Sequence, residues 1–186
     1  MKNLFFTILA VILFSLSACN SREKFIRPHD WEDTSIEDTE FFISHPTGWD
    51  ILIIDKITFL ESNEQTLKIT LGILPESYTK ELKSKKDHFD SIRLGVEDNY
   101  RELTEETALV NLQEKSADVV EKALNTIYYI EYSIKWINKD YGNSIIYADV
   151  FTPDGTVFQF TCNPDNFEVT ETIKQLCLEI SGSIRK

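Results

Sequence analysis

Basic residues are scarce in this 186-residue chain, and their scarcity excludes a large class of partners. Lysine and arginine together number 19 against 31 aspartates and glutamates, so the formal net charge is −12. Nucleic-acid binding depends on a stripe or patch of basic side chains that neutralises backbone phosphates. The sequence contains no such stripe, and we therefore expect no nucleic-acid partner.

Metal ligands and catalytic motifs are equally sparse. None of the three histidines, His29, His45 and His88, has a second ligand at a spacing typical of a metal site. The chain lacks a phosphate-cradling glycine loop, a dinucleotide-binding fingerprint and a G-x-S-x-G elbow. Carboxylates are abundant, but in so acidic a chain no catalytic pair can be singled out. The sequence thus predicts no metal, no cofactor and no reactive centre.

A single long apolar run lies at the amino terminus. Lys2 gives a positive start, and residues 4–16 are almost wholly apolar. As a helix this run would span about 20 Å, which is short of the roughly 30 Å hydrocarbon core of a bilayer. We therefore interpret residues 1–18 as an export signal and not as a permanent transmembrane helix.

The end of this run, Leu16-Ser17-Ala18-Cys19, resembles the lipobox of bacterial lipoproteins. The resemblance implies that Cys19 becomes the first residue and carries a diacylglyceryl group as a thioether, which anchors the exported chain to a membrane. Ordinary cleavage after Ser17 or Ala18, which would leave a free thiol, is the alternative. Asn20 is not the Asp that retains some lipoproteins in the inner membrane, so we favour the outer membrane or the cell surface.

The mature chain divides into a tether and one domain. Residues 19–38 lack sustained periodicity and are rich in carboxylates, which predicts a solvated acidic tether. Residues 39–186 are long enough for a single domain with a substantial core. Alternation of apolar and polar residues predicts strands at residues 41–43, 49–54, 57–60, 67–73, 109–113, 126–136, 144–151 and 157–162. Residues 117–125 are ambiguous between a connector and a strand.

Two amphipathic helices complete the predicted domain. The first is capped at Ser77 or Thr79 and reaches Leu103, with Gly95 as a weak point inside it. The second starts at Asn163-Pro164 and ends near Gly182. The fold class is therefore α+β, an antiparallel sheet of about six to seven strands packed by a long central helix and a C-terminal helix.

Two cysteines and three aromatic residues are the remaining candidates for a special role. Cys162 points to the inner side of its strand and Cys177 lies on the buried face of the last helix, so the two thiols can meet in the core. A disulfide and two buried free thiols both remain open, with free thiols slightly favoured. Trp49, Trp136 and Tyr141 lie in or next to turns, where aromatic faces can bind a ligand. Packing is favoured for the two tryptophans, and less so for Tyr141.

Four stretches also match a known fold. They are the run from Phe41 to Trp49, the helix before a tyrosine-rich meander, the Gly155–Phe160 segment that leads into a closing helix, and the terminal Ser183–Lys186. Together they resemble the PsbP-like fold of photosystem accessory proteins, DcrB-type bacterial lipoproteins and a Ran-binding nuclear transport factor. The glycine that often opens the long meander strand is replaced by Leu124-Asn125. The resemblance implies an α/β/α sandwich with a binding or assembly role and no shared catalytic residues.

These observations lead to one expected function and two alternatives. We expect a lipid-anchored, non-enzymatic module of the cell envelope that binds a protein partner or helps to assemble one. The first alternative is an envelope hydrolase with carboxylates in a cleft between sheet and helix. The second is a module that delivers a small ligand or a metal.

Overall fold

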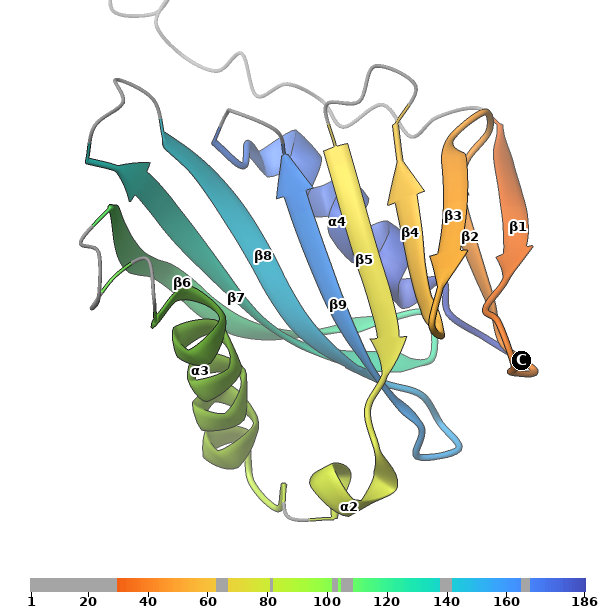
Figure 1. The fold of residues 1–186 in the computed structure, drawn as a ribbon. Helices are drawn as coiled ribbons and strands as arrows, with labels where there is room; N and C mark the ends of the chain where they lie inside the picture. Colours follow the sequence, from red (N-terminus) through yellow and green to blue (C-terminus); the bar gives the residue numbers. More distant parts are fainter. Residues whose placement is uncertain are drawn as a thin grey trace, which may run out of the picture.

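The computed structural model describes residues 30–62, 67–80, 82–101, 104, 109–137, 142–164 and 168–186. Its centre is a seven-stranded antiparallel sheet in the order β3-β4-β5-β9-β8-β7-β6, and a two-stranded sheet pairs β1 with β2 (Figure 1). The predicted α+β class is confirmed, with α3 and α4 packed on opposite faces of the large sheet. The strands are β1 Trp31–Ser35, β2 Phe42–Pro46, β3 Asp50–Ile54, β4 Ile57–Glu61, β5 Leu67–Ile73, β6 Val110–Lys122, β7 Asn125–Trp136, β8 Gly142–Phe151 and β9 Val157–Pro164. The helices are α2 Glu76–Thr79, α3 Lys85–Arg101 and α4 Glu171–Gly182.

The tyrosine-rich strand β7 is buried on both faces. Ile130 and Tyr132 belong to the core that packs under α3, whereas Ile127 and Tyr129 belong to the core on the α4 side. Successive side chains of a strand point to opposite faces of the sheet, so each helix covers one of the two faces of β7. The predicted turn between β8 and β9 is also present, and Gly155 adopts a positive φ of 88° there.

The predicted boundary between tether and domain at residues 38 and 39 is wrong. Trp31–Ser35 forms β1, which pairs antiparallel with β2, and Ile36 is only 1% exposed. Asp33, predicted to be solvated, accepts hydrogen bonds from Ser44 Oγ at 2.6 Å and from Arg185 Nη2 at 2.5 Å. Ser44 lies on the neighbouring strand β2 and Arg185 near the end of the chain, so the composition of residues 19–38 did not reveal them. Residues 19–29 of the predicted tether lie outside the described residues.

The predicted central helix is shorter than expected and does not begin at Ser77 or Thr79. A short helix α2 ends at Thr79, and α3 begins at Lys85. Ser84 Oγ accepts a hydrogen bond from the Asp87 N–H at 3.2 Å, and Asp87 Oδ2 accepts one from the Lys83 N–H at 3.1 Å. The first bond satisfies an N–H group that the first turn of a helix leaves free, and the second ties the preceding residue to that turn, so the chain caps α3 here.

Two further corrections concern the bounds of β6 and the start of α4. Residues 109–113 and the ambiguous 117–125 mostly form one strand, β6, with a bulge between Glu114 and Ser116. A bulge shifts the alternation of faces, which explains why the pattern was ambiguous. Asn163-Pro164 does not start a helix but ends β9, where Pro164 lies opposite Leu67. The helix α4 begins later, with Thr170 Oγ1 accepting a hydrogen bond from the Ile173 N–H at 3.3 Å.

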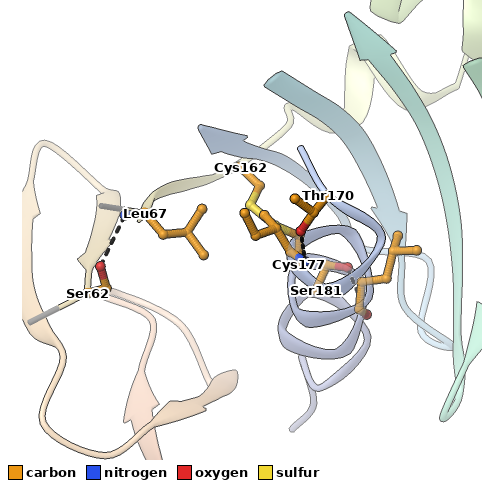
Figure 2. Close-up of a disulfide and its surroundings, with 8 residues drawn as sticks. Ser62, Leu67, Cys162, Thr170, Cys177 and Ser181 are labelled. Atoms are coloured by element: carbon orange, nitrogen blue, oxygen red, sulfur yellow. Dashed lines mark hydrogen bonds between the residues drawn. A yellow bond between two sulfur atoms is a disulfide. The ribbon is translucent and has the colours of Figure 1, made fainter. Parts of the chain in front are cut away.

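A disulfide joins the sheet to α4. Cys162 of β9 and Cys177 of α4 are bonded and are both fully buried, with their Cα atoms 6.2 Å apart (Figure 2). The slight preference for two free thiols is therefore wrong, although the predicted meeting of the two side chains in the core is observed. The bond ties α4 to a central strand, so the α4 side of the domain is covalently held.

Candidate functional site

The two faces of the large sheet are covered unequally. On one face, α4 and residues that flank the β1–β2 pair share a core with β4, β5, β7, β8 and β9. On the other face, the core under α3 contains residues of β6, β7 and β8 only. Figure 1 shows α3 over one end of the sheet, with the remaining strands bare on that side. We call the bare part the open half-face; it consists of Gln159, Thr161, Asn163, Lys68, Thr70, Gly72, Ile57, Phe59, Glu61, Asp50, Leu52 and Ile54.

Strand register shows that this surface is continuous with the surface under α3. Residues directly opposite each other on neighbouring strands point to the same face. One such row crosses six strands, through Ile130, Tyr147, Thr161, Thr70, Phe59 and Leu52. Exposure rises along it from 0% at Ile130 to 58% at Leu52. The same face of the sheet thus passes from buried core to solvent.

The outer part of the open half-face is apolar. Leu52 lies opposite Phe59, and Ile54 lies opposite Ile57, across the β3–β4 pair. Ile54 is 49% exposed and Ile57 is 38% exposed. We call these four residues the apolar strip. Single exposed apolar residues are normal on a protein surface, whereas a contiguous group of them marks an interaction site.

The strand β3 is also an edge of the sheet with unused hydrogen-bonding groups. Asp55 and Lys56, with φ of 50° and 69°, form a two-residue loop between Ile54 and Ile57. Positive φ at both positions is typical of a type I′ turn, in which the flanking residues exchange both backbone hydrogen bonds. It follows that the N–H and C=O groups of Ile51 and Ile53 point outward. Within the described part of the chain, no backbone hydrogen bond to this outer edge is observed.

Grooves with acidic rims lie at both ends of the apolar strip. One groove, with a volume of ≈ 340 Å³, is lined by Asp50, Glu61 and Lys68 beside Leu52 and Phe59. The other, with a volume of ≈ 430 Å³, is lined by Ile57 and Ile73 and by Glu37, Asp38, Asp55 and Lys56. Two ion pairs cross these rims, Lys68 to Glu61 at 3.3 Å and Lys56 to Asp38 at 3.8 Å. The rims together carry five carboxylates and two ammonium groups, a net charge of −3.

A buried carboxylate lies under α3, beyond the open half-face. Asp149 of β8 is 1% exposed, and its Oδ2 atom has no hydrogen-bond partner among the described residues. It lines a cavity of ≈ 10 Å³ together with Gly95 of α3 and Gln159 of β9. Burial raises the pKa of this carboxyl group to about 7. A cavity of this size holds at most one water molecule, so Asp149 has no room for a substrate.

His88 of α3 is also buried, and it packs on Tyr128, which lies opposite Asp149 across the β7–β8 pair. Its ring centroid is 4.2 Å from that of Tyr128 and 4.7 Å from that of Phe151. Burial lowers the pKa of His88, and its Nδ1 atom has no hydrogen-bond partner. The hydroxyl of Tyr78 is hydrogen bonded to Ser91 Oγ. Burial, together with the negative charge of Asp149, raises the pKa of Tyr78 to about 12. The packing between α3 and the sheet thus includes buried ionisable side chains beside its apolar ones.

Comparison with solved structures identifies the fold. The solution structure of cyanobacterial PsbP (CyanoP) from Synechocystis sp. PCC 6803 matches with a TM-score of 0.57 over 90% of this chain and 98% of that chain. The chain has a PsbP-like fold. Sequence identity to CyanoP is 12%, so the likeness concerns the fold alone. Comparison with known protein families finds no family that matches, and comparison with curated proteins finds no relative.

Of the predicted site residues that the structure describes, Cys162 and Cys177 are brought together, whereas Trp49 and Trp136 pack against different cores of the PsbP-like domain. Trp49 and Trp136 are each partly buried, Trp49 against the core under α4 and Trp136 against the core under α3. Cys19 and Tyr141 lie outside the described residues. The sequence missed the apolar strip, although the run from Ile51 to Ile54 was visible in it. What the sequence did not show is that these residues form an edge strand.

The two histidines that the structure describes, His45 and His88, are buried in the PsbP-like domain and pack against its own residues. His45 is buried, and its Nε2 atom is hydrogen bonded to Thr34 Oγ1 at 2.8 Å. His29 lies outside the described residues. Among the residues that the structure describes, no group of three or more histidine, cysteine, aspartate or glutamate side chains gathers to hold a metal ion. None of the described helices is long and apolar enough to cross a membrane.

Proposed function

We propose that this chain is an exported, lipid-anchored, non-enzymatic module of the cell envelope that holds a protein partner on its open half-face. The observation that carries this proposal is the apolar strip beside an edge strand whose outward backbone groups make no backbone hydrogen bond to any residue that the structure describes. Natural proteins protect such edges, because exposed apolar edge strands pair with other chains and aggregate. A strand with four consecutive apolar residues at an edge, Ile51 to Ile54, is therefore best explained by a partner that covers it.

The proposed anchor places the domain close to a membrane. Only residues 20–29 separate Cys19 from Asp30, whose carbonyl accepts a hydrogen bond from the Thr47 N–H at 3.1 Å. Ten residues reach at most about 35 Å when fully extended. The domain would thus stay near the bilayer, held there by the lipid and not by its acidic surface. The lipobox-like leader and the PsbP-like fold together support assignment to the DcrB-type lipoproteins as part of this proposal.

The anchor makes a direct prediction. Protein extracted from membranes is expected to begin at Cys19 and to carry a mass increment of a diacylglyceryl group, with or without a further acyl chain. Cys19→Ser removes the sulfur that forms the thioether, so this variant is expected to keep its leader and to gain no lipid. Intact-mass measurement of both proteins tests this, and an unmodified Cys19 in membrane-extracted protein contradicts it.

The binding surface makes a second prediction. A photoreactive residue in place of Leu52, activated in native membranes, is expected to form a specific adduct with another protein. The matched control is the same residue in place of Leu124, which is 80% exposed in the turn between β6 and β7. Position 52 lies in the apolar strip and position 124 does not, so the adduct is expected at 52 alone. Equal cross-linking at both positions, or none at 52, contradicts the proposed surface.

The two alternative functions receive no specific support from the geometry. A hydrolase would need two converging carboxylates with raised pKa values in a cleft. Glu97 and Glu114 line a cleft of ≈ 520 Å³ between α3 and β6, but Glu114 is paired with Arg93 at 2.8 Å, and this ion pair lowers the pKa of Glu114. Asp149 has a raised pKa but is enclosed in a cavity of ≈ 10 Å³. Metal delivery would need a cluster of ligands, and the described residues contain none. We therefore propose the binding module alone.

A further inference from the structure

We propose that the occupant of the open half-face is an extended segment of a partner protein, with an apolar centre and basic residues at both ends, that adds as a strand to the outer edge of β3. This inference rests on the proposed function and names the chemistry of the partner. It is drawn from three features of the described residues: the outward backbone groups, the apolar strip and the acidic rims at its two ends.

The backbone of β3 defines the mode of binding. The N–H and C=O groups of Ile51 and Ile53 point away from β4, so an added strand can hydrogen bond to them. Such a strand would extend along the five residues of β3, about 17 Å. Its side chains would alternate, half of them beside Leu52 and Ile54 and the other half beside Ile51 and Ile53.

The neighbouring side chains define the composition of the occupant. All four positions that an added strand would meet in the middle are leucine or isoleucine, which favours an apolar centre. Glu61 and Asp50 lie at one end of β3, and Asp55 and Asp38 lie at the other, where Glu37 adds a further carboxylate. Among the described residues, Asp50, Asp55 and Glu37 take part in no ion pair. Carboxylates at both ends of an apolar strip are complementary to basic residues at both ends of a bound segment.

Charge also argues against the other occupants of this surface. A second copy of the chain would bring another formal charge of −12 and the same acidic rims against the first copy. An anionic bilayer surface would be repelled for the same reason. A basic segment is the occupant that relieves the repulsion among these carboxylates.

The test uses the full chain purified in detergent and a short fluorescein-labelled peptide, with a centre of valine and threonine and lysines at both ends. Binding is measured by fluorescence anisotropy at low salt. The control peptide has glutamates in place of the lysines. We expect the lysine peptide to bind and the glutamate peptide not to bind, and we expect added salt to weaken the binding.

Two variants locate the peptide on the protein. Asp50→Lys combined with Asp55→Lys is expected to weaken binding by about tenfold or more. The control, Asp118→Lys combined with Glu121→Lys, makes the same change in net charge at two exposed positions of β6, at the opposite edge of the sheet, and is expected to have little effect. Ile51→Pro removes one outward N–H and is expected to weaken binding about fivefold while β3 keeps its pairing with β4.

The outcomes separate this inference from the proposed function. If the lysine peptide does not bind, or if both double variants weaken it equally, the inferred chemistry is wrong. An adduct at position 52 in native membranes would in that case still support a binding module with a different partner. If the protein forms dimers without the peptide, and if Asp50→Lys combined with Asp55→Lys strengthens them, the occupant is a second copy of the chain. If the protein binds vesicles through the apolar strip, the occupant is a bilayer. Either result overturns the inference.

Discussion

Replacing Asp149 with asparagine is expected to stabilise the protein at pH 8 by on the order of 4 kcal/mol and to have little effect near pH 3. Burial raises the pKa of this carboxyl from 3.8 to about 7, so between these values the folded state holds a proton that the unfolded state has lost. Stability therefore falls as the pH rises through this range, and the full penalty applies above pH 7. A shift of about 3 pKa units corresponds to about 4 kcal/mol. Asparagine has the shape of the neutral acid and cannot ionise.

The other buried titratable groups between α3 and the sheet define the control. His88 has a lowered pKa, so its contribution to stability rises with pH below about 6.5 and opposes that of Asp149. Tyr78 and Tyr147 have pKa values raised by burial and stay protonated throughout. Comparing Asp149→Asn with the unchanged protein at each pH cancels these contributions, and Asp118→Asn on exposed β6 controls for the loss of a charge. Chemical unfolding from pH 3 to pH 8 measures the effect, and a stabilisation that does not grow with pH would show that titration of Asp149 is not its cause.

Removing the disulfide has the second-largest expected effect. Cys162→Ala combined with Cys177→Ala is expected to lower the free energy of unfolding by about 3 kcal/mol, because the bond closes a loop of 15 residues in the unfolded chain. The double variant leaves no lone buried thiol. Both sulfur atoms are fully buried between β9 and α4, so loss of packing adds to the entropic effect.

Urea unfolding with and without dithiothreitol tests this prediction. The reductant is expected to bring the unchanged protein close to the stability of the double variant and to leave the double variant itself unaffected. A reduced protein as stable as the oxidised one would mean that the bond does not form in solution. Formation of the bond also agrees with the proposed export, since structural disulfides persist in oxidising compartments.

Much of the secondary structure could be predicted because it depends on local periodicity. The alternation in β5, β7 and β9 and the turn at Gly155 were visible in neighbouring residues. The errors came where a distant partner, a bulge or a local cap decided the outcome. The carboxylates around Trp31 looked like a solvated tether, yet β1 is held by β2 and by Arg185 at the other end of the chain. The start of α3 was misplaced because Ser84 and Asp87 cap it within a run of charged residues.

The candidate site was harder to predict than the fold. Trp49 and Trp136 were chosen for their chemistry, and each is partly buried against a core. Leu52 and Ile54 resemble ordinary core residues in the sequence, because their strand is as apolar as the buried ones. The burial of Asp149 could not be predicted either, because a carboxylate within an apolar strand is expected to lie on the exposed face of that strand. Only its position under Gly95 and Val96 of α3 makes it buried.

By itself the sequence determined most of the strands and the existence of the two long helices, which side chains of each element are apolar, and that Cys162 and Cys177 point into the same interior. The tertiary structure decided that β3 lies at an edge, that α3 covers only half of its face of the sheet, and that Asp149 is enclosed. The physical reason is that periodicity reports which side chains share a face of one element. The order of strands and the position of a helix over them depend on hydrogen bonds and packing between segments far apart in the chain.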